Sequence, residues 1–197
     1  NYRRLKLIRP GASCQIWEAI RDSDSKRVAL KMLQPEFAQN KEEIEFLRHE
    51  LEVAKEFRHP NVIEVYDFGI DKGLAYLVLE LSLWKNLKLV MRDSPETLTP
   101  NIPKVIEQAA EGLKYMHEKG WVHRDIKPDN FLVSDEGAVK LIDFAIAQKP
   151  TKGLAKLFGP RGRSKGRAAT CRPSRFGTRR SNSARTFTAS AACCSNW

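Results

Sequence analysis

The chain has 197 residues and a formal net charge of +10, since its 34 lysine and arginine residues outnumber its 24 aspartate and glutamate residues. The excess lies in residues 151–197, which contain basic residues and no acidic one, so residues 1–150 are close to neutral. Cys14 is the one cysteine before residue 151, which excludes a disulfide scaffold there and predicts a cytoplasmic setting. We find no signal peptide and no apolar run of about 18 residues that predicts a membrane segment.

The first part of the chain predicts a sheet with one helix. Stretches rich in branched and aromatic residues are typical of strands, and these are Arg3–Ile8, Cys14–Arg21, Arg27–Leu33, Val62–Ile70 and Leu74–Leu81. Residues 41–57 instead repeat apolar side chains at spacings of three and four, at Ile44, Leu47, Leu51 and Ala54. That period predicts an amphipathic helix between the third and fourth strands.

A second helix is predicted from about Ile102 to His117, ending near Gly120. Its expected buried face consists of Ile102, Val105, Ala109, Leu113 and Met116. Strands followed by a mainly helical part favour an α+β fold in two lobes. We expect an N-lobe of about 1–82, with a five-stranded antiparallel sheet and one helix, and a partial C-lobe of about 83–150.

Two neighbouring segments, VHRDIKPDNFLV and VKLIDFAIA, carry the chemistry. Asp125 is followed by Lys127 and Asn130, and these groups can accept a hydroxyl proton, neutralise a moving phosphoryl group and ligate a metal. Asp143 follows an apolar strand and supplies the hard oxygen that Mg²⁺ prefers. Any one of them could be a solvated loop residue, but the set in this order indicates phosphoryl transfer.

With these motifs, residues from about Tyr2 to Gln148 resemble the catalytic domain of the eukaryotic-type serine/threonine protein kinases, in its bacterial form. The resemblance implies that Asp125 is the catalytic aspartate and Lys127 the catalytic-loop lysine, in the serine/threonine form of that loop. It implies that Asn130 and Asp143 bind the metal. It further implies ATP with Mg²⁺, with Mn²⁺ as the alternative metal, and a protein substrate with a serine or threonine hydroxyl.

The resemblance also assigns residues to the nucleotide. Lys31 of VALK would hold the α- and β-phosphates and pair with Glu50. Gly11 is assigned to the phosphate loop, and Ile16, Ala29 and Leu132 are assigned to the two sides of the adenine. Leu79 is assigned to the gatekeeper position, and Glu80 and Ser82 are assigned to the hinge. His123 and Phe144 are expected to pack rather than to take part in chemistry.

Two positions depart from the family pattern. The loop G-x-G-x-x-G reads RPGASC, so Arg9 and Cys14 replace two glycines that would let the backbone close over phosphates. We interpret Cys14 as a small packing residue rather than a reactive thiol. Ala145 replaces the glycine of D-F-G, and alanine disfavours a positive φ, which should narrow the conformations after Asp143. The departures leave a nucleotide-binding pseudokinase or scaffold as an alternative function.

Residues 151–197 do not continue the resemblance, because the S/A-P-E and D-x-Y/W-S-F-G motifs are absent from them. Shifting the reading frame by one base permits both motifs, in the family's order, between Gly166 and Trp197. We therefore interpret 151–197 as a basic tail that is disordered or frame-shifted, which predicts an incomplete C-lobe and a weakly active or inactive fragment. A basic tail that binds nucleic acid is the less favoured alternative, since no specific nucleic-acid motif is present. The sequence carries no signal of oligomeric state.

Overall fold

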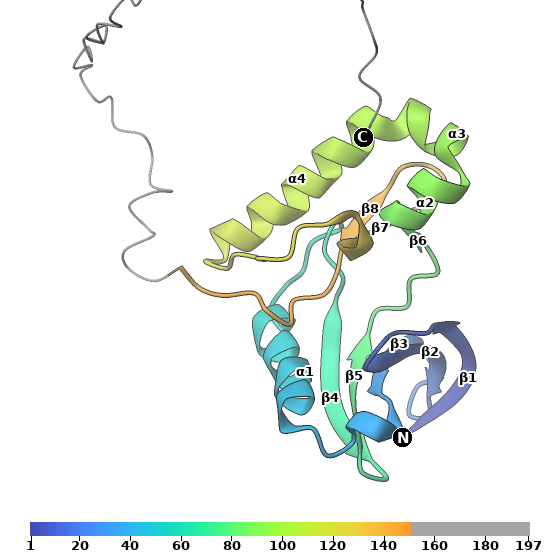
Figure 1. The fold of residues 1–197 in the computed structure, drawn as a ribbon, viewed down its shortest axis with the longest axis vertical. Coiled ribbons are helices and arrows are strands. Elements are labelled where there is room, and N and C mark those ends of the chain that lie inside the picture. Colours follow the sequence, from blue (N-terminus) through green and yellow to red (C-terminus); the bar gives the residue numbers. More distant parts are fainter. Residues whose placement is uncertain (151–197) are drawn as a thin grey trace, which may run out of the picture. The chain divides into compact units, whose positions relative to one another are not determined.

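The computed structural model describes residues 1–150, and our predictions for residues 151–197 lie outside this part of the chain. In chain order the elements are β1 (Tyr2–Arg9), β2 (Cys14–Arg21), β3 (Arg27–Leu33), a 3-10 turn (Pro35–Phe37), α1 (Lys41–Ala54), β4 (Val65–Asp71), β5 (Leu74–Leu79), β6 (Lys85–Asn86), α2 (Leu87–Asp93), α3 (Pro95–Leu98), a 3-10 turn (Thr99–Asn101), α4 (Ile102–Glu118), a 3-10 turn (Pro128–Asn130), β7 (Phe131–Val133) and β8 (Val139–Leu141). Figure 1 shows the strands β1 to β5 and helix α1 in one part of the ribbon, and α2 to α4 with β6 to β8 in the other.

The first five strands form one antiparallel sheet in the order β1-β2-β3-β5-β4. The predicted α+β class, with a five-stranded N-lobe, one helix and a partly helical C-lobe, is therefore confirmed. The fourth strand was predicted to begin at Val62, but β4 begins at Val65. Val62 instead makes a parallel bridge to Leu141 of β8, which joins this segment to the C-lobe.

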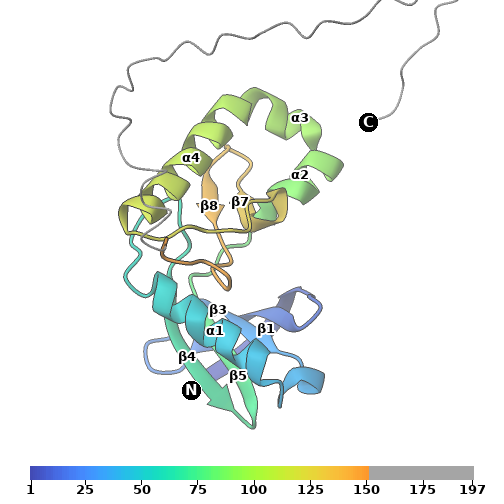
Figure 2. The same cartoon turned by 60° about the vertical axis from the view of Figure 1, so that its left-hand side comes forward.

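Helix α1 covers one face of the sheet, next to β4 and β5 (Figure 2). The Asn40 side chain caps its first turn by accepting hydrogen bonds from the amides of Glu42 and Glu43. Leu47 and Ala54 are buried, as their spacing predicted, and Ile44 and Leu51 are half-buried against the same core. The buried face also contains a carboxylate, Glu50, which an apolar period does not predict.

In the C-lobe, α4 packs on β8 and buries Val105, Gly112 and Met116. Gly112 permits α4 to approach Asn61, whose carbonyl accepts from the amide of Leu141 on β8, because a Cβ at Gly112 would lie 2.7 Å from that carbonyl oxygen. The prediction that Ile102 is buried is wrong, since it is 43% exposed. The first turn of α4 lies against the polar turn between β7 and β8, where Lys104 donates to the carbonyl of Glu136 at 2.7 Å.

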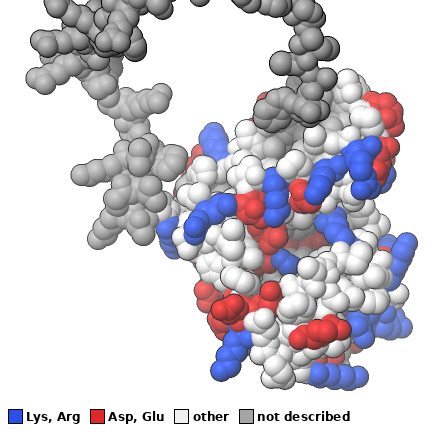
Figure 3. Space-filling model, viewed as in Figure 1, with Lys and Arg blue, Asp and Glu red and all other residues white. Residues whose placement is uncertain are grey.

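The surface of the described part is mixed in charge. On the face shown in Figure 3, acidic and basic side chains are intermingled, in agreement with the near-neutral composition of residues 1–150. Within the same residues, no helix combines the length and the apolar character that a membrane crossing requires.

Candidate active site

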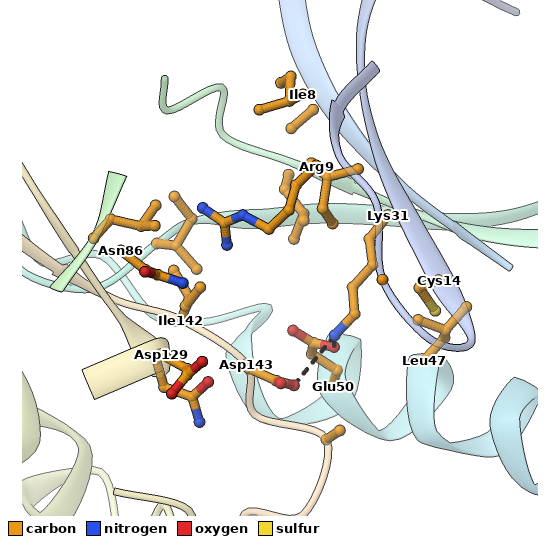
Figure 4. A pocket seen from close by; sticks show the side chains of 18 of the residues that line it. Ile8, Arg9, Cys14, Lys31, Leu47, Glu50, Asn86, Asp129, Ile142 and Asp143 are labelled. Carbon is orange, nitrogen blue, oxygen red and sulfur yellow. Dashed lines mark hydrogen bonds and ion pairs between the residues drawn. The ribbon is translucent and has the colours of Figure 1, made fainter. Parts of the chain in front are cut away.

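A cavity of about 660 Å³ lies between the five-stranded sheet and the segment that contains β6, β7 and β8. Figure 4 shows side chains from both lobes pointing into it. All the residues assigned to the nucleotide or the metal line this cavity, together with one catalytic residue, namely Gly11, Ile16, Ala29, Lys31, Glu50, Leu79, Glu80, Ser82, Leu132, Asn130, Asp143 and Lys127. Asp125 is not part of the lining, but it contacts two residues that are.

Lys31 on β3 joins two carboxylates from different parts of the fold. Its Nζ donates to Oε2 of Glu50 on α1 at 2.7 Å and to Oδ1 of Asp143 at 3.2 Å. Burial lowers the pKa of Lys31, but the charges of Glu50 and Asp143 outweigh it and raise the pKa above its usual value. Glu50 is only 2% exposed, so its negative charge depends on this lysine. Lys31 therefore remains a cation at neutral pH.

Asp125, Lys127 and Asn130 form a second cluster on the loop before β7. The Nζ of Lys127 donates to Oδ2 of Asp125 at 2.6 Å, and Nδ2 of Asn130 donates to the same oxygen at 2.9 Å. The hydrogen bond from Lys127 is the main cause that lowers the pKa of Asp125, with a smaller contribution from Asn130. Asp125 is therefore ionised at neutral pH and can accept a further hydrogen bond.

Asn130 and Asp143 present oxygen atoms that suit a hard cation. Nδ2 of Asn130 donates to the backbone carbonyl of Asp125 at 2.8 Å and to its carboxylate, so Oδ1 is the atom of this amide that could ligate a cation. Lys31 engages Oδ1 of Asp143, which leaves Oδ2. Burial opposes ionisation of Asp143, but Lys31 outweighs it and lowers the pKa of this carboxyl. The amide and carboxylate oxygens of Asn130 and Asp143 are therefore suitable ligands for Mg²⁺ or Mn²⁺.

His123 and Phe144 pack beneath the two clusters, as the sequence predicts. Both side chains are buried, and their rings meet edge to face at 5.8 Å. His123 Nε2 donates to the carbonyl of Ile142 at 3.0 Å, and Nδ1 accepts from the amide of Asp125 at 3.3 Å. Burial is the main cause that lowers the pKa of His123, so its ring is neutral. The ring thereby connects the loop of Asp125 to Ile142, the residue before Asp143.

The backbone on either side of this ring is unusual. Arg124 has φ 69° and Asp143 has φ 67°, in the left-handed region that side chains disfavour. Such conformations often occur at functional sites, where the surrounding packing over-determines them. Ala145 does not belong to the positive-φ residues of this part of the chain, so alanine fits the observed backbone there without that strain.

The far end of the cavity has an apolar lining and unused backbone groups. Ile16 and Ala29 come from β2 and β3 of the five-stranded sheet, and Leu132 comes from β7 on the other side of the cavity. No backbone hydrogen bond within residues 1–150 uses the carbonyl of Glu80 or the amide of Ser82. Apolar side chains on two sides, with a backbone donor and acceptor at one edge, suit a purine base.

Gly11 and Gln34 fix the conformation of the loop between β1 and β2. A Cβ at Gly11 would lie 2.3 Å from the carbonyl oxygen of Cys14, so only glycine fits this turn. The side-chain amide of Gln34 donates to the carbonyls of Gly11 and Ala12 at 2.7 and 2.9 Å. Burial raises the pKa of the Cys14 thiol, in agreement with a packing residue.

Sequence reasoning assigned no site role to several residues that line the cavity, among them Arg9, Asn86, Asp129 and Ile142. Asn86 precedes α2, and its side-chain oxygen accepts from the amide of Leu89 at 2.8 Å. No helix was predicted to begin at residue 87, so no sequence signal pointed to Asn86.

The chain matches one family model and several known proteins. The family model described as the protein kinase domain matches residues 2–160. The chain is similar to serine/threonine-protein kinase PknA of Mycobacterium tuberculosis, with 36% identity over 153 residues, and to serine/threonine-protein kinases PknA of Corynebacterium glutamicum, with 34% over 156 residues. It is 31% identical over 148 residues to a protein of Clostridium acetobutylicum named as a probable serine/threonine-protein kinase.

The matches cover most of this chain and a smaller part of the relatives. Each of the three alignments covers 75% of this chain. They cover 36% of the Mycobacterium protein, 33% of the Corynebacterium protein and 22% of the Clostridium protein. The chain therefore spans about a third or less of the length of these relatives.

Proposed function

The chain belongs to the protein kinase domain family, and we propose that it binds ATP with Mg²⁺, or Mn²⁺, at the cavity between its lobes. We propose that the site belongs to an enzyme that transfers the γ-phosphoryl group to a serine or threonine hydroxyl of a protein. The observation that carries the proposal is the position of Lys31, which contacts both Glu50 and Asp143 at the cavity that Lys127 and Asn130 also line.

The apolar walls and the hinge would hold the base of ATP. The carbonyl of Glu80 and the amide of Ser82 supply an acceptor and a donor to the purine edge, between Ile16, Ala29 and Leu132. Lys31 would donate to the α- and β-phosphates, since two carboxylates keep it charged and oriented. Asn130 and Asp143 would hold the metal, which would neutralise negative charge on the phosphates.

Asp125 would act as the base. The substrate hydroxyl donates a hydrogen bond to its carboxylate while the hydroxyl oxygen attacks the γ-phosphorus, and the bond from phosphorus to the β,γ-bridging oxygen breaks. ADP leaves with that electron pair, and the hydroxyl proton passes to Asp125 and then to solvent. Lys127, at 2.6 Å from Asp125, would offset negative charge on the moving phosphoryl group.

We expect this chain to bind Mg·ATP weakly and to show negligible transfer of the phosphoryl group to protein. Residues 151–197 contain neither of the family motifs that follow Asp143, and these would hold a peptide hydroxyl in line with the γ-phosphate. Positioning supplies much of the rate of phosphoryl transfer, so binding can persist where transfer is slow. The alternative, a nucleotide-binding scaffold, shares the first property but has no transfer step.

Calorimetric titration with Mg·ATP and a radiolabelled transfer assay on a serine-rich protein test the proposal together. Wild type should bind Mg·ATP, Lys31→Met should lose most of this affinity, and Asp125→Asn should keep the affinity but lose any transfer. Lys114→Met is the matched control, because its exposed side chain pairs with Glu118 on α4 away from the cavity. Binding that Lys31→Met leaves intact would contradict the proposed site.

A further inference from the structure

Arg9 places a positive charge at the cavity from a position where the family has a glycine. It is the last residue of β1 and pairs with Ile16 of β2, so the strand fixes its backbone. Its half-buried side chain extends across the cavity on the side of Asn86 and Asp129 (Figure 4). Our sequence analysis treated this residue only as a lost glycine.

The other two cations that line the cavity already have carboxylate partners. Lys31 contacts Glu50 and Asp143, and Lys127 contacts Asp125. Within residues 1–150, by contrast, no hydrogen bond or ion pair involves the Arg9 guanidinium; the carboxylate of Asp129 pairs with Lys88 at 3.3 Å. Arg9 is thus the cavity cation whose donors remain available in this part of the chain.

A half-buried guanidinium without a partner is energetically unfavourable, and an anion in the cavity would relieve this. Burial lowers the pKa of Arg9, and the charge of Asp129 opposes that effect without forming a contact. A guanidinium has five N–H donors in a planar fork that matches a phosphate group and forms charge-assisted hydrogen bonds with it. The phosphates of a nucleotide are the anions that the proposed function brings into this cavity.

We propose that Arg9 is a phosphate-binding residue of the nucleotide site, which makes the cavity select nucleoside di- and triphosphates over nucleosides. The inference rests on the proposed ATP site but adds a contact that the glycine-rich loop of the family does not supply. At this position a charged side chain takes over part of the role of the backbone in a flexible glycine loop. The loop itself is held by Gln34, so it need not fold down over the ligand.

Titration of the full chain with adenosine, Mg·ADP and Mg·ATP separates Arg9 from the rest of the site. We compare wild type with Arg9→Gln, which removes the charge at similar length, and with Arg9→Lys, which keeps the charge but not the fork. Arg3→Gln is the matched control, since Arg3 lies on the same strand, is exposed and does not line the cavity. It changes the net charge by the same amount.

Arg9→Gln should weaken Mg·ADP and Mg·ATP by about tenfold, the change that a lost charge-assisted contact of about 1.4 kcal/mol produces. Arg9→Lys should fall between Arg9→Gln and wild type, and adenosine affinity and Arg3→Gln should be unchanged. Equal weakening of adenosine would overturn the inference, because Arg9 would then shape the cavity rather than bind phosphate. Tighter ATP binding by Arg9→Gln would also overturn it and identify the side chain as an obstruction. Wild type that binds neither adenosine nor ATP would refute the proposed function and this inference with it.

Discussion

Replacement of Lys31 by methionine should destabilise the fold as well as empty the nucleotide site. Lys31 is 17% exposed at its side chain, and it is the partner of Glu50, whose side chain is 2% exposed. Methionine has similar length but no charge, so the substitution leaves a buried carboxylate unpaired. Breaking a buried pair in this way costs about 3–5 kcal/mol, a large part of the ~5–15 kcal/mol by which a domain is stable.

The loss of stability should depend on pH. Burial raises the pKa of Glu50, and in Lys31→Met no cation opposes it, so the folded chain binds the Glu50 proton more tightly than the unfolded chain. Relative to wild type, stability then decreases as the pH rises from about 4.3, the usual carboxyl pKa, through the raised folded pKa. Asp143 acts in the same direction, because Lys31 lowers its pKa and this contribution disappears in the variant.

Urea unfolding followed by tryptophan fluorescence, at pH 5 and pH 8, measures both effects. Lys31→Met should lose several kcal/mol at pH 8 and clearly less at pH 5. The double variant Lys31→Met/Glu50→Gln should recover part of the loss and most of the pH dependence. Lys114→Met, which removes an exposed cation 3.8 Å from Glu118, should change stability by about 0.5 kcal/mol or less. If Lys31→Met and Lys114→Met lost equal stability at both pH values, the buried ion pair would not have the role assigned to it.

Three further predictions concern the loop, the thiol and the reading frame. Gly11→Ala should weaken Mg·ATP several-fold in a titration, since its Cβ would displace the carbonyl of Cys14; unchanged affinity would show that the loop does not contact the nucleotide. Cys14 should react with iodoacetamide more slowly at pH 7.5 than a free thiol does, because burial raises its pKa, and a faster reaction monitored by mass spectrometry would contradict this. A chain in which the frame is shifted by one base before Gly166 and extended through a full C-lobe should phosphorylate serine or threonine; Asp125→Asn should abolish this, whereas ATP binding without transfer would favour the scaffold.

The sequence alone determined the secondary structure of the N-lobe and the chemical groups of the site. Strand and helix periods depend on local spacing, which is why five strands and α1 were predicted close to their observed bounds. Asp125, Lys127 and Asn130 lie within six consecutive residues, so their spacing along the chain is enough to bring them together. Only the family resemblance linked Lys31 to Glu50.

Other features depended on which surfaces meet, and only the tertiary structure decided them. Lys31 and Asp143 are 112 residues apart, and their 3.2 Å contact requires both lobes. Ile102 has the same helical spacing as Val105, yet it is exposed because a polar turn, not an apolar layer, lies beside it. Arg9 matches no sequence motif, and its proposed role in phosphate binding follows from a cavity whose other cations are already paired. Periodicity specifies a face of an element, but packing decides which neighbour, charge or water that face meets.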